Sequence, residues 1–298
     1  MPVFNKGLLE GFNKATALPS DKNQQRQWQA ANRSWWESNP MQYNWTNPLQ
    51  FEKFSPEWFR EIDRRFFEDS QTYAPYKRIP FDPLIDFAAL RDRDVLEIGV
   101  GMGTHAQLLA SHARSFTGVD LTETAISTTK RRFEVARVSG KLLRMDAESL
   151  EFPDRSFDTV WSWGVIHHSS NTPLVLSEIH RVLRPGGQAR IMVYHRGALY
   201  FMLGLSGALG HGWQAAVQRR TDGALGRYYS VPEWKTLAAK TGFRVSNVRI
   251  FGSIQEAIPL PAGALKSKLC QVLPGAAARG LLTHARLGSY LFCVLDKI

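Results

Sequence analysis

The segment from Asp94 to His105, DVLEIGVGMGTH, limits the possible folds of this chain more than any other segment. Its first half is a short apolar run that suits a buried parallel strand and carries one acid, Glu97. Three glycines follow at alternate positions: Gly99, Gly101 and Gly103. Because glycine adopts backbone conformations that other residues avoid, they let the chain turn sharply and pass close to a ligand before a helix that begins near Thr104. The segment predicts a nucleotide-type cofactor site between a strand and a helix.

The spacing of these glycines differs from the one that binds a dinucleotide pyrophosphate. That fingerprint reads G-x-G-x-x-G, and counted from Gly99 its last glycine would fall at Thr104. The pattern here is E-x-G-x-G-x-G. It disfavours a nicotinamide dehydrogenase.

Further segments downstream alternate strands with helices. Phe116 to Leu121 predicts a strand that ends at Asp120, about 20 residues after the first glycine, where a carboxylate can accept hydrogen bonds from ribose hydroxyls. A short strand ending at Asp146 comes next. The segments 152–170 and 182–194 predict a fourth strand with the loop above it, and then a helix end, a tight turn and a fifth strand. This alternation predicts a parallel sheet whose ligands bind at the carboxyl ends of the strands.

Taken together, residues 90–195 resemble the class I S-adenosylmethionine-dependent methyltransferases, most closely the bacterial group that includes the ubiquinone and menaquinone biosynthesis enzymes (methyltransferase type 11). The resemblance implies an α/β fold: a Rossmann-like, mostly parallel seven-stranded sheet with an antiparallel final strand. It implies S-adenosylmethionine as cofactor, with Asp146 near the adenine amino group. The cofactor-binding residues that it implies are Glu97, Gly99, Gly101, Gly103, Asp120, Leu121, Asp146, Ala147 and Trp163.

By composition the chain divides into four parts: an aromatic-rich N-terminal extension (1–75), the cofactor-binding core (76–195), a hydrophobic insert (196–229) and a C-terminal part that completes the sheet (230–298). The extension holds five of the nine tryptophans, and we expect either a structural clasp over the core or a lining of the substrate pocket. Two Asn residues and a proline within Trp35–Trp45 predict an irregular loop. A helix is predicted from Ser55 as cap and Pro56 to about Phe67.

The insert contains a long uncharged stretch, Gly197 to Gln218. It is about long enough to span a bilayer, but its internal glycines and its place between two strands of one sheet argue against a span. We expect a hydrophobic lid over the pocket, with a membrane-surface helix, a core helix or an oligomer contact as alternatives. Strands at 244–251 and 289–295 would complete the sheet. Between them, residues 257–288 contain basic side chains and no acid.

The catalytic candidates follow the fourth and fifth predicted strands. They are His167, His168, His195 and Tyr194. Histidine is the usual base near neutral pH, although one of the paired histidines would serve equally well to hold the cofactor loop. Two cysteines without partners at metal-ligand spacing predict neither a disulfide framework nor a metal site.

The preferred hypothesis is methyl transfer to a hydrophobic small molecule such as a quinone, a polyketide, a lipid-linked compound or another secondary metabolite. The alternatives are a regulatory or partner subunit that binds the cofactor without methyl transfer and, less favoured, an RNA methyltransferase. The net charge of +10 comes with no nucleic-acid-binding motif, so no nucleic acid is expected. We expect a cytoplasmic protein without a secretory signal, with peripheral contact to a membrane surface as an alternative. No motif determines an oligomeric state.

Overall fold

The computed structural model describes residues 9–12, 14, 16–43, 47–74, 76, 78–211, 213–258, 260 and 263–298. Trp45 of the predicted loop lies outside these residues. The helices are α1 (Lys22–Ser38), α2 (Pro56–Tyr73), α3 (Thr104–Ala110), α4 (Glu123–Ala136), α5 (Thr172–Val182), α6 (Ala198–His211), α7 (Trp213–Arg220), α8 (Val231–Lys240), α9 (Ala264–Val272) and α10 (Gly275–Thr283). The strands are β1 (Asp94–Ile98), β2 (Ser115–Asp120), β3 (Lys141–Arg144), β4 (Phe157–Trp163), β5 (Leu183–Tyr194), β6 (Phe243–Phe251) and β7 (Tyr290–Lys297).

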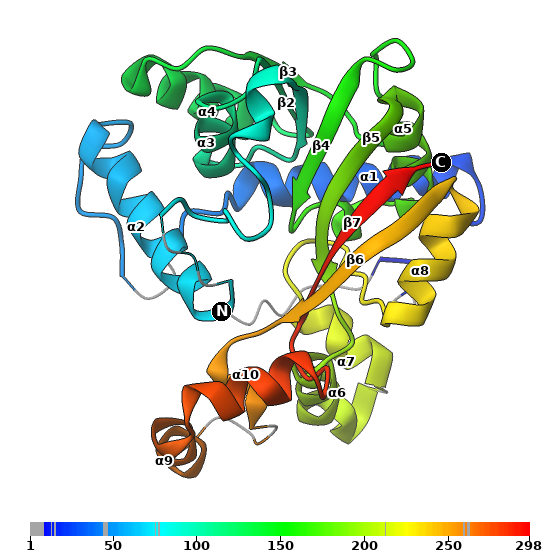
Figure 1. Cartoon of the computed structure of the whole chain (residues 1–298). Coiled ribbons are helices and arrows are strands. Elements are labelled where there is room, and N and C mark those ends of the chain that lie inside the picture. Colours follow the sequence, from blue (N-terminus) through cyan, green and yellow to red (C-terminus); the bar gives the residue numbers. More distant parts are fainter. Residues whose placement is uncertain are drawn as a thin grey trace.

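The seven strands form one sheet in the order β3-β2-β1-β4-β5-β7-β6, with helices packed around it (Figure 1). Strands β1 to β5 pair in parallel, whereas β7 pairs antiparallel with both β5 and β6. The predicted mostly parallel seven-stranded sheet with an antiparallel final strand is confirmed. The parallel arrangement brings the carboxyl ends of β1, β2, β4 and β5 to one edge, which is where such sheets bind ligands.

The central strands are buried on both faces, as their apolar sequences require. Val95, Leu96 and Val160 are fully buried, and α5 packs Val175, Leu176 and Ile179 against the sheet core. Because this core holds β1 and β4 side by side, the loops that leave their carboxyl ends start from fixed positions.

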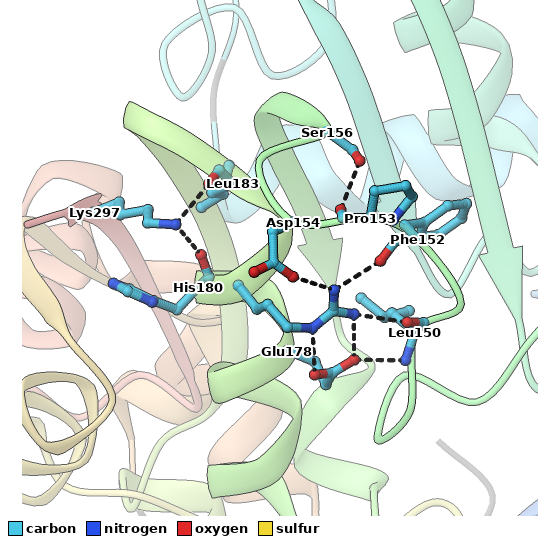
Figure 2. A network of polar contacts seen from close by, with 10 residues as sticks. Leu150, Phe152, Pro153, Asp154, Ser156, Glu178, His180, Leu183 and Lys297 are labelled. Carbon is cyan, nitrogen blue, oxygen red and sulfur yellow. Dashed lines mark hydrogen bonds and ion pairs between the residues drawn. The ribbon is translucent and has the colours of Figure 1, made fainter.

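Arg181 of α5 anchors the segment that follows β3 (Figure 2). Its guanidinium donates to the carbonyls of Leu150 and Phe152, at 2.7 Å each, and to the carboxylates of Asp154 and Glu178. At the end of the same helix, Nζ of Lys297 donates to the carbonyls of His180 and Leu183 at 2.6 and 2.7 Å. The final strand therefore caps the last turn of α5. These bonds lie at the amino ends of the strands, so this edge carries charged links that hold the scaffold.

The N-terminal extension differs in part from the expectation. Helix α1 reaches Ser38, so the prediction that the whole of Trp35–Trp45 is an irregular loop is wrong for its first four residues. The helix ends where Pro40 disfavours a helical conformation at Asn39. Helix α2 begins as predicted, with Oγ of Ser55 accepting from the Trp58 amide, and continues beyond Phe67 to Tyr73.

The insert forms α6 and α7, which lie with α9 and α10 beyond the carboxyl end of β5, in the lower part of Figure 1. Within the part of the chain that the structure describes, no helix has the length and apolar character needed to cross a membrane.

Candidate functional site

A cavity of about 240 Å³ opens at the carboxyl edge of the sheet. Its walls come from the ends of β1, β2, β4 and β5, from α1 and the loop after it, and from the start of β7. Of the predicted cofactor residues, it is lined by Glu97, Gly99, Gly101, Asp120, Leu121, Ala147 and Trp163. The motifs read from the sequence therefore converge on one cavity.

The glycine turn brings bare backbone to the cavity wall. Gly99 has a φ of +84°, and a Cβ there would lie 2.2 Å from Cγ2 of Val165. Gly101 has a φ of +53°, but a Cβ there would meet no atom within 4 Å. Since Gly101 lines the cavity, that open space is where a ligand can approach the main chain.

Asp120 closes the turn from the end of β2. Its Oδ2 accepts a hydrogen bond from the Gly101 amide at 3.1 Å, and its Oδ1 accepts from the amide and the hydroxyl of Thr122 at 3.0 and 2.8 Å. Burial raises the pKa of Asp120 above its ordinary value, although these hydrogen bonds oppose that rise. The carboxylate therefore links the glycine turn to the loop before α4 and faces the cavity.

Glu97 is a buried acid with an unpaired oxygen. Its side chain lines the cavity at 2% exposure, and its Oε2 has no hydrogen-bond partner among the described residues. Burial, and then the negative charge of Asp120, raise the pKa of Glu97 well above the ordinary value of a glutamate. A buried carboxyl that lacks a partner is costly unless a ligand supplies one, so this position suits a cationic ligand group.

Asp146 is placed differently from the other predicted residues. Its Oδ1 accepts from Nε2 of Gln29 at 2.8 Å and from the amide of Glu148 at 2.9 Å. The cavity is lined by its neighbours Met145 and Ala147 and not by Asp146 itself. Its contact with adenine stays a prediction, and so does any direct contact of Gly103, which also lies outside the lining.

Helix α1 covers the cavity, and the sequence analysis did not predict this helix. Gln29, Asn32 and Trp36 line the cavity from it. Asn32 is 5% exposed, and its Oδ1 has no partner within the described part of the chain. At the end of the helix, Glu37 accepts from the amides of Glu123 and Thr124 at 2.9 and 2.8 Å and so caps α4.

A signal for α1 was present in the sequence. Oδ1 of Asp21 accepts from the amides of Asn23 and Gln24, which makes Asp21 a helix N-cap. The residues that face inward, Trp28, Asn32 and Trp36, recur every four positions, which is helical spacing. An N-cap followed by this period predicts a helix.

His168 is the one histidine of the predicted set that lines the cavity. Its Nδ1 lies 2.5 Å from the carbonyl oxygen of Leu225, and its ring packs edge-to-face against Trp36 with 5.0 Å between centroids. Because a carbonyl only accepts hydrogen bonds, a neutral His168 carries its proton on Nδ1 and its lone pair on Nε2. That tautomer is the one a proton acceptor needs.

The other two predicted histidines lie behind the wall. His167 is completely buried, and neither ring nitrogen has a hydrogen-bond partner among the described residues. Burial, with smaller contributions from His168 and Arg227, holds the pKa of His167 well below the ordinary value. His195 places its Nδ1 2.8 Å from the carbonyl of Gly288. Neither ring reaches the cavity, so both suit structural roles.

Tyr194 lines the cavity at the end of β5. Its hydroxyl donates to Oδ2 of Asp222 at 3.1 Å, and its ring packs against His167 with 3.9 Å between centroids. Burial first, and then the charge of Asp222, raise the pKa of Tyr194 well above its ordinary value. The phenol therefore stays protonated at neutral pH and suits an orienting role.

His105 is a cavity residue that the sequence analysis missed, because the segment was read for its glycines. It lies in the first turn of α3, and its ring is enclosed by aromatic rings with centroids at 4.6 to 5.7 Å: Phe66, Phe81, Trp161 and Trp163. Its Nε2 is buried and has no partner in the described residues. Burial lowers the pKa of His105 to about 3, so the ring is neutral at physiological pH.

Away from Glu97 and Asp120, the cavity is mostly apolar and aromatic, although Gln29, Asn32, His105 and His168 also line it. The apolar and aromatic side chains of this end are Trp36, Pro40, Met41, Tyr43, Phe66, Met192, Tyr194 and Tyr290. Across the described chain, no lysine or arginine lines the cavity. No described side chain of residues 196–229 lines it either, so the lid role of the insert stays a prediction, and the cover that the structure shows comes from the N-terminal extension.

Comparison with protein families identifies the core. Residues 96–191 match the family model described as a methyltransferase domain. The chain is 37% identical over 102 residues to the fatty-acid O-methyltransferase of Mycolicibacterium smegmatis, which covers 34% of this chain and 36% of that relative. It is 38% identical over 100 residues to the phthiotriol/phenolphthiotriol dimycocerosates methyltransferase of Mycobacterium tuberculosis, covering 33% and 36%. The matched region thus spans about a third of the length of these curated relatives.

Solved structures share the fold over more of the chain. A Bacillus halodurans protein assigned as a methyltransferase has a TM-score of 0.52 at 19% identity, covering 73% of this chain and 98% of that one. The [4+2]-cyclase SpnF has a TM-score of 0.51 at 17% identity, covering 94% and 97%. Residues 96–191 are thus matched to a methyltransferase domain of the type 11 group, and S-adenosylmethionine is the cofactor that this kind of domain uses.

Proposed function

We propose that this chain transfers a methyl group from S-adenosylmethionine to a hydroxyl of a neutral, apolar small molecule. The observation that carries the proposal is the cavity itself. One end holds the buried carboxyls of Glu97 and Asp120, and the other end is aromatic, with no cationic side chain among the described lining residues. An anionic acceptor would lie near two acids without a counter-charge, whereas a neutral apolar one meets matching surface.

The chain's own residues fit the cofactor. The space beside Gly101 admits a ligand against the backbone, and the unpaired Oε2 of Glu97 suits the ammonium of the methionyl moiety. Asp120 would accept hydrogen bonds from the ribose, and Leu121, Ala147 and Trp163 would pack against the rest of the molecule. When bound, the sulfonium cofactor supplies an activated methyl group for in-line displacement.

His168 and Tyr194 would prepare the acceptor. With its proton held on Nδ1 by the Leu225 carbonyl, His168 would take the hydroxyl proton of the acceptor at Nε2. Tyr194, which stays protonated, would orient the acceptor oxygen. The aromatic lining would exclude water and hold the acceptor in line, which is the main contribution that a protein makes to such a displacement.

The relatives support an apolar acceptor. The names of the two curated relatives refer to a fatty acid and to phthiotriol and phenolphthiotriol dimycocerosates, all of them lipids. A quinone, a polyketide or a lipid-linked alcohol would fit the same surface. The cavity favours the hydroxyl-bearing members over a free carboxylate, because no described cation lines it.

A second candidate is cofactor binding without methyl transfer. The observation in its favour is the fold shared with SpnF, a [4+2]-cyclase, over 94% of this chain. The place of His168 in the cavity wall favours the methyltransferase, since a regulator needs no proton acceptor. An RNA methyltransferase is disfavoured because the lining offers no cation for phosphates.

Two measurements test the proposal in sequence. The first is calorimetric binding of S-adenosylmethionine and S-adenosylhomocysteine, with a nicotinamide dinucleotide as control; binding of the two sulfur compounds alone is expected. The second is methyl transfer to a matched set of one alkyl chain ending in an alcohol, a carboxylic acid or an amine, and to a hydrophobic phenol. Turnover of the hydroxyl compounds supports the proposal. Turnover of the carboxylic acid alone would contradict the proposal that the acceptor is neutral. Cofactor binding without turnover of any compound would favour a protein that binds the cofactor without methyl transfer.

A further inference from the structure

Helix α9 carries its apolar residues on the outside. Leu265, Leu269 and Val272 are 66%, 37% and 75% exposed, and their i, i+4, i+7 spacing places them on one face. The helix has two lysines, of which Lys268 is exposed and Lys266 points inward: Lys266 is 8% exposed, and its Nζ donates to the carbonyl of Leu260 at 3.0 Å. Lys266 also contacts Sδ of Met202 in α6, so it fixes the rotation of α9. A surface helix of a globular protein normally shows the opposite pattern.

The charged side chains of the segment that carries this face have one sign. Residues 257–288 contain four lysines and arginines and no acid. Besides the buried Lys266, these are Lys268, Arg279 and Arg286, which are exposed and form no ion pair with any described residue. Two copies of such a face would repel each other, because like charges would meet. The complementary surface is apolar and negatively charged.

The face belongs to the connection that leads into the acceptor end of the cavity. Helices α9 and α10 connect β6 to β7, and the first residue of β7, Tyr290, lines the cavity. Figure 1 shows α9 and α10 at the same end of the molecule as α6, whose Phe201 is 56% exposed. A surface that held this face would therefore lie at the end of the molecule from which β7 enters the cavity wall.

We propose that the outward face of α9, defined by Leu265, Leu269 and Val272, docks on an anionic lipid bilayer together with the exposed basic residues of the same connection: Lys268 of α9, Arg279 of α10 and Arg286 after it. The apolar side chains enter the boundary between headgroups and acyl chains, and the basic side chains pair with lipid phosphates. The link to an apolar acceptor rests on the proposed function, but docking itself requires neither cofactor nor methyl transfer. The proposed membrane contact therefore lies on α9 and not on the uncharged insert, for which the sequence suggested a membrane-surface helix as an alternative.

The test is co-sedimentation of the full chain with vesicles, without cofactor or acceptor. We expect binding to vesicles of phosphatidylglycerol and phosphatidylcholine, weaker binding to phosphatidylcholine alone, and loss of binding as salt is raised. Val272→Asp and Leu265→Asp are each expected to weaken binding by about tenfold or more. The matched control is Ile298→Asp, because Ile298 is 74% exposed and Val272 75%; it should bind like the unchanged chain. Lys268→Glu should weaken binding and reduce its dependence on salt.

Thermal unfolding checks that each variant is folded, so a misfolded variant is not mistaken for a docking mutant. Equal binding by Val272→Asp and the unchanged chain, or no preference for anionic vesicles, would overturn the proposal. So would a change in oligomeric state of Val272→Asp in vesicle-free solution, since the face would then be a protein interface. Failure of methyl transfer in every acceptor assay leaves the vesicle result intact, which separates this inference from the proposed function.

Discussion

The two ends of the cavity are built in different ways. The cofactor end comes from short segments at the ends of β1 and β2, and its groups are carboxyls and bare backbone. The acceptor end gathers side chains as distant in sequence as Trp36 and Tyr290, and most of them are aromatic or apolar. The cofactor end therefore recognises its ligand through individual polar contacts, whereas the acceptor end recognises its ligand through shape and apolar surface. If this contrast is right, single polar changes should be severe at the first end and mild at the second.

The largest effect is expected for Asp120→Ala. The carboxylate accepts from the Gly101 amide and from Thr122, and we expect it to hold the ribose as well. Hydrogen bonds to a charged group contribute roughly 1.5–3 kcal/mol each, so loss of two ribose contacts should raise the Kd for S-adenosylmethionine by about 100-fold or more. Calorimetry measures this directly.

Asp154→Ala is the matched control, because Asp154 lies at the opposite edge of the sheet and pairs with Arg181. It should leave the Kd within about twofold, since an exposed ion pair contributes little. Equal losses in the two variants would mean that Asp120 acts through folding and not through the cofactor.

His168→Asn comes next and tests the group that we propose as the proton acceptor. The amide nitrogen of asparagine can replace Nδ1 as donor to the Leu225 carbonyl, while the basic Nε2 is lost. General bases contribute about 10²–10⁴-fold, so kcat should fall by at least about 100-fold while the cofactor Kd stays within a few-fold. His195→Asn is the control, because His195 does not line the cavity. If His195→Asn lowered kcat as much as His168→Asn, the proposed role of His168 as proton acceptor would be wrong.

This contrast also explains what the sequence could predict. The glycine turn and Asp120 are consequences of local backbone geometry: a strand must end, and the chain must turn before α3. Both features are visible as a fixed spacing of residues in the sequence. Their convergence on one cavity was therefore predictable. Asp146 was predicted as a cofactor residue from the same kind of spacing. Its carboxylate, however, accepts a hydrogen bond from Gln29 of α1, which lies 117 residues earlier in the chain.

The acceptor end depended on tertiary packing. His105 is enclosed by aromatic rings from α2, from the segment after α2 and from β4. No local sequence pattern predicts that these rings come together. The uncharged insert was taken for the lid because its composition was unusual. Composition indicates that a segment needs apolar contacts, but it does not say whether the segment lines the cavity or packs behind its wall, as Val217 does against Tyr200 and Tyr228.

Glu97→Gln should give two effects of opposite sign. Burial raises the pKa of Glu97 in the folded state, so its stabilising contribution is full below the ordinary value near 4.5 and is lost as pH rises through the raised pKa. The neutral amide escapes this loss, and the apo-protein should melt at a higher temperature than the unchanged chain at pH 8. Cofactor affinity should fall by about tenfold, because an amide cannot pair with an ammonium as a carboxylate does.

Calorimetry in buffers of different ionisation enthalpy sharpens this test. When a cation binds beside a protonated Glu97, the carboxyl should lose its proton, so binding to the unchanged chain should release protons and binding to Glu97→Gln should not. Equal proton release by the two proteins would show that Glu97 does not meet the charged group of the cofactor.

His105→Phe should produce the smallest effect on function and so tests the acceptor end most closely. Burial lowers the pKa of His105 to about 3, so its stabilising contribution is full above the ordinary value near 6.5 and is lost as pH falls from 6.5 toward 3. One proton accounts for at most about 1.4 kcal/mol per pH unit in that window. Phenylalanine removes this dependence and also the unpartnered Nε2, so the variant should unfold less readily in acid and be about 1 kcal/mol more stable at pH 7.

If the acceptor end recognises by shape, His105→Phe should keep its turnover within about threefold, because the cage around position 105 is already aromatic and accepts another ring. His105→Gln supplies the control, since it restores a polar atom at the expense of ring packing and should therefore be the less stable and less active of the two. The reverse order, with the phenylalanine variant nearly inactive and the glutamine variant active, would mean that the acceptor meets a hydrogen-bonding group at His105. The contrast between a polar cofactor end and an apolar acceptor end would then fail at His105.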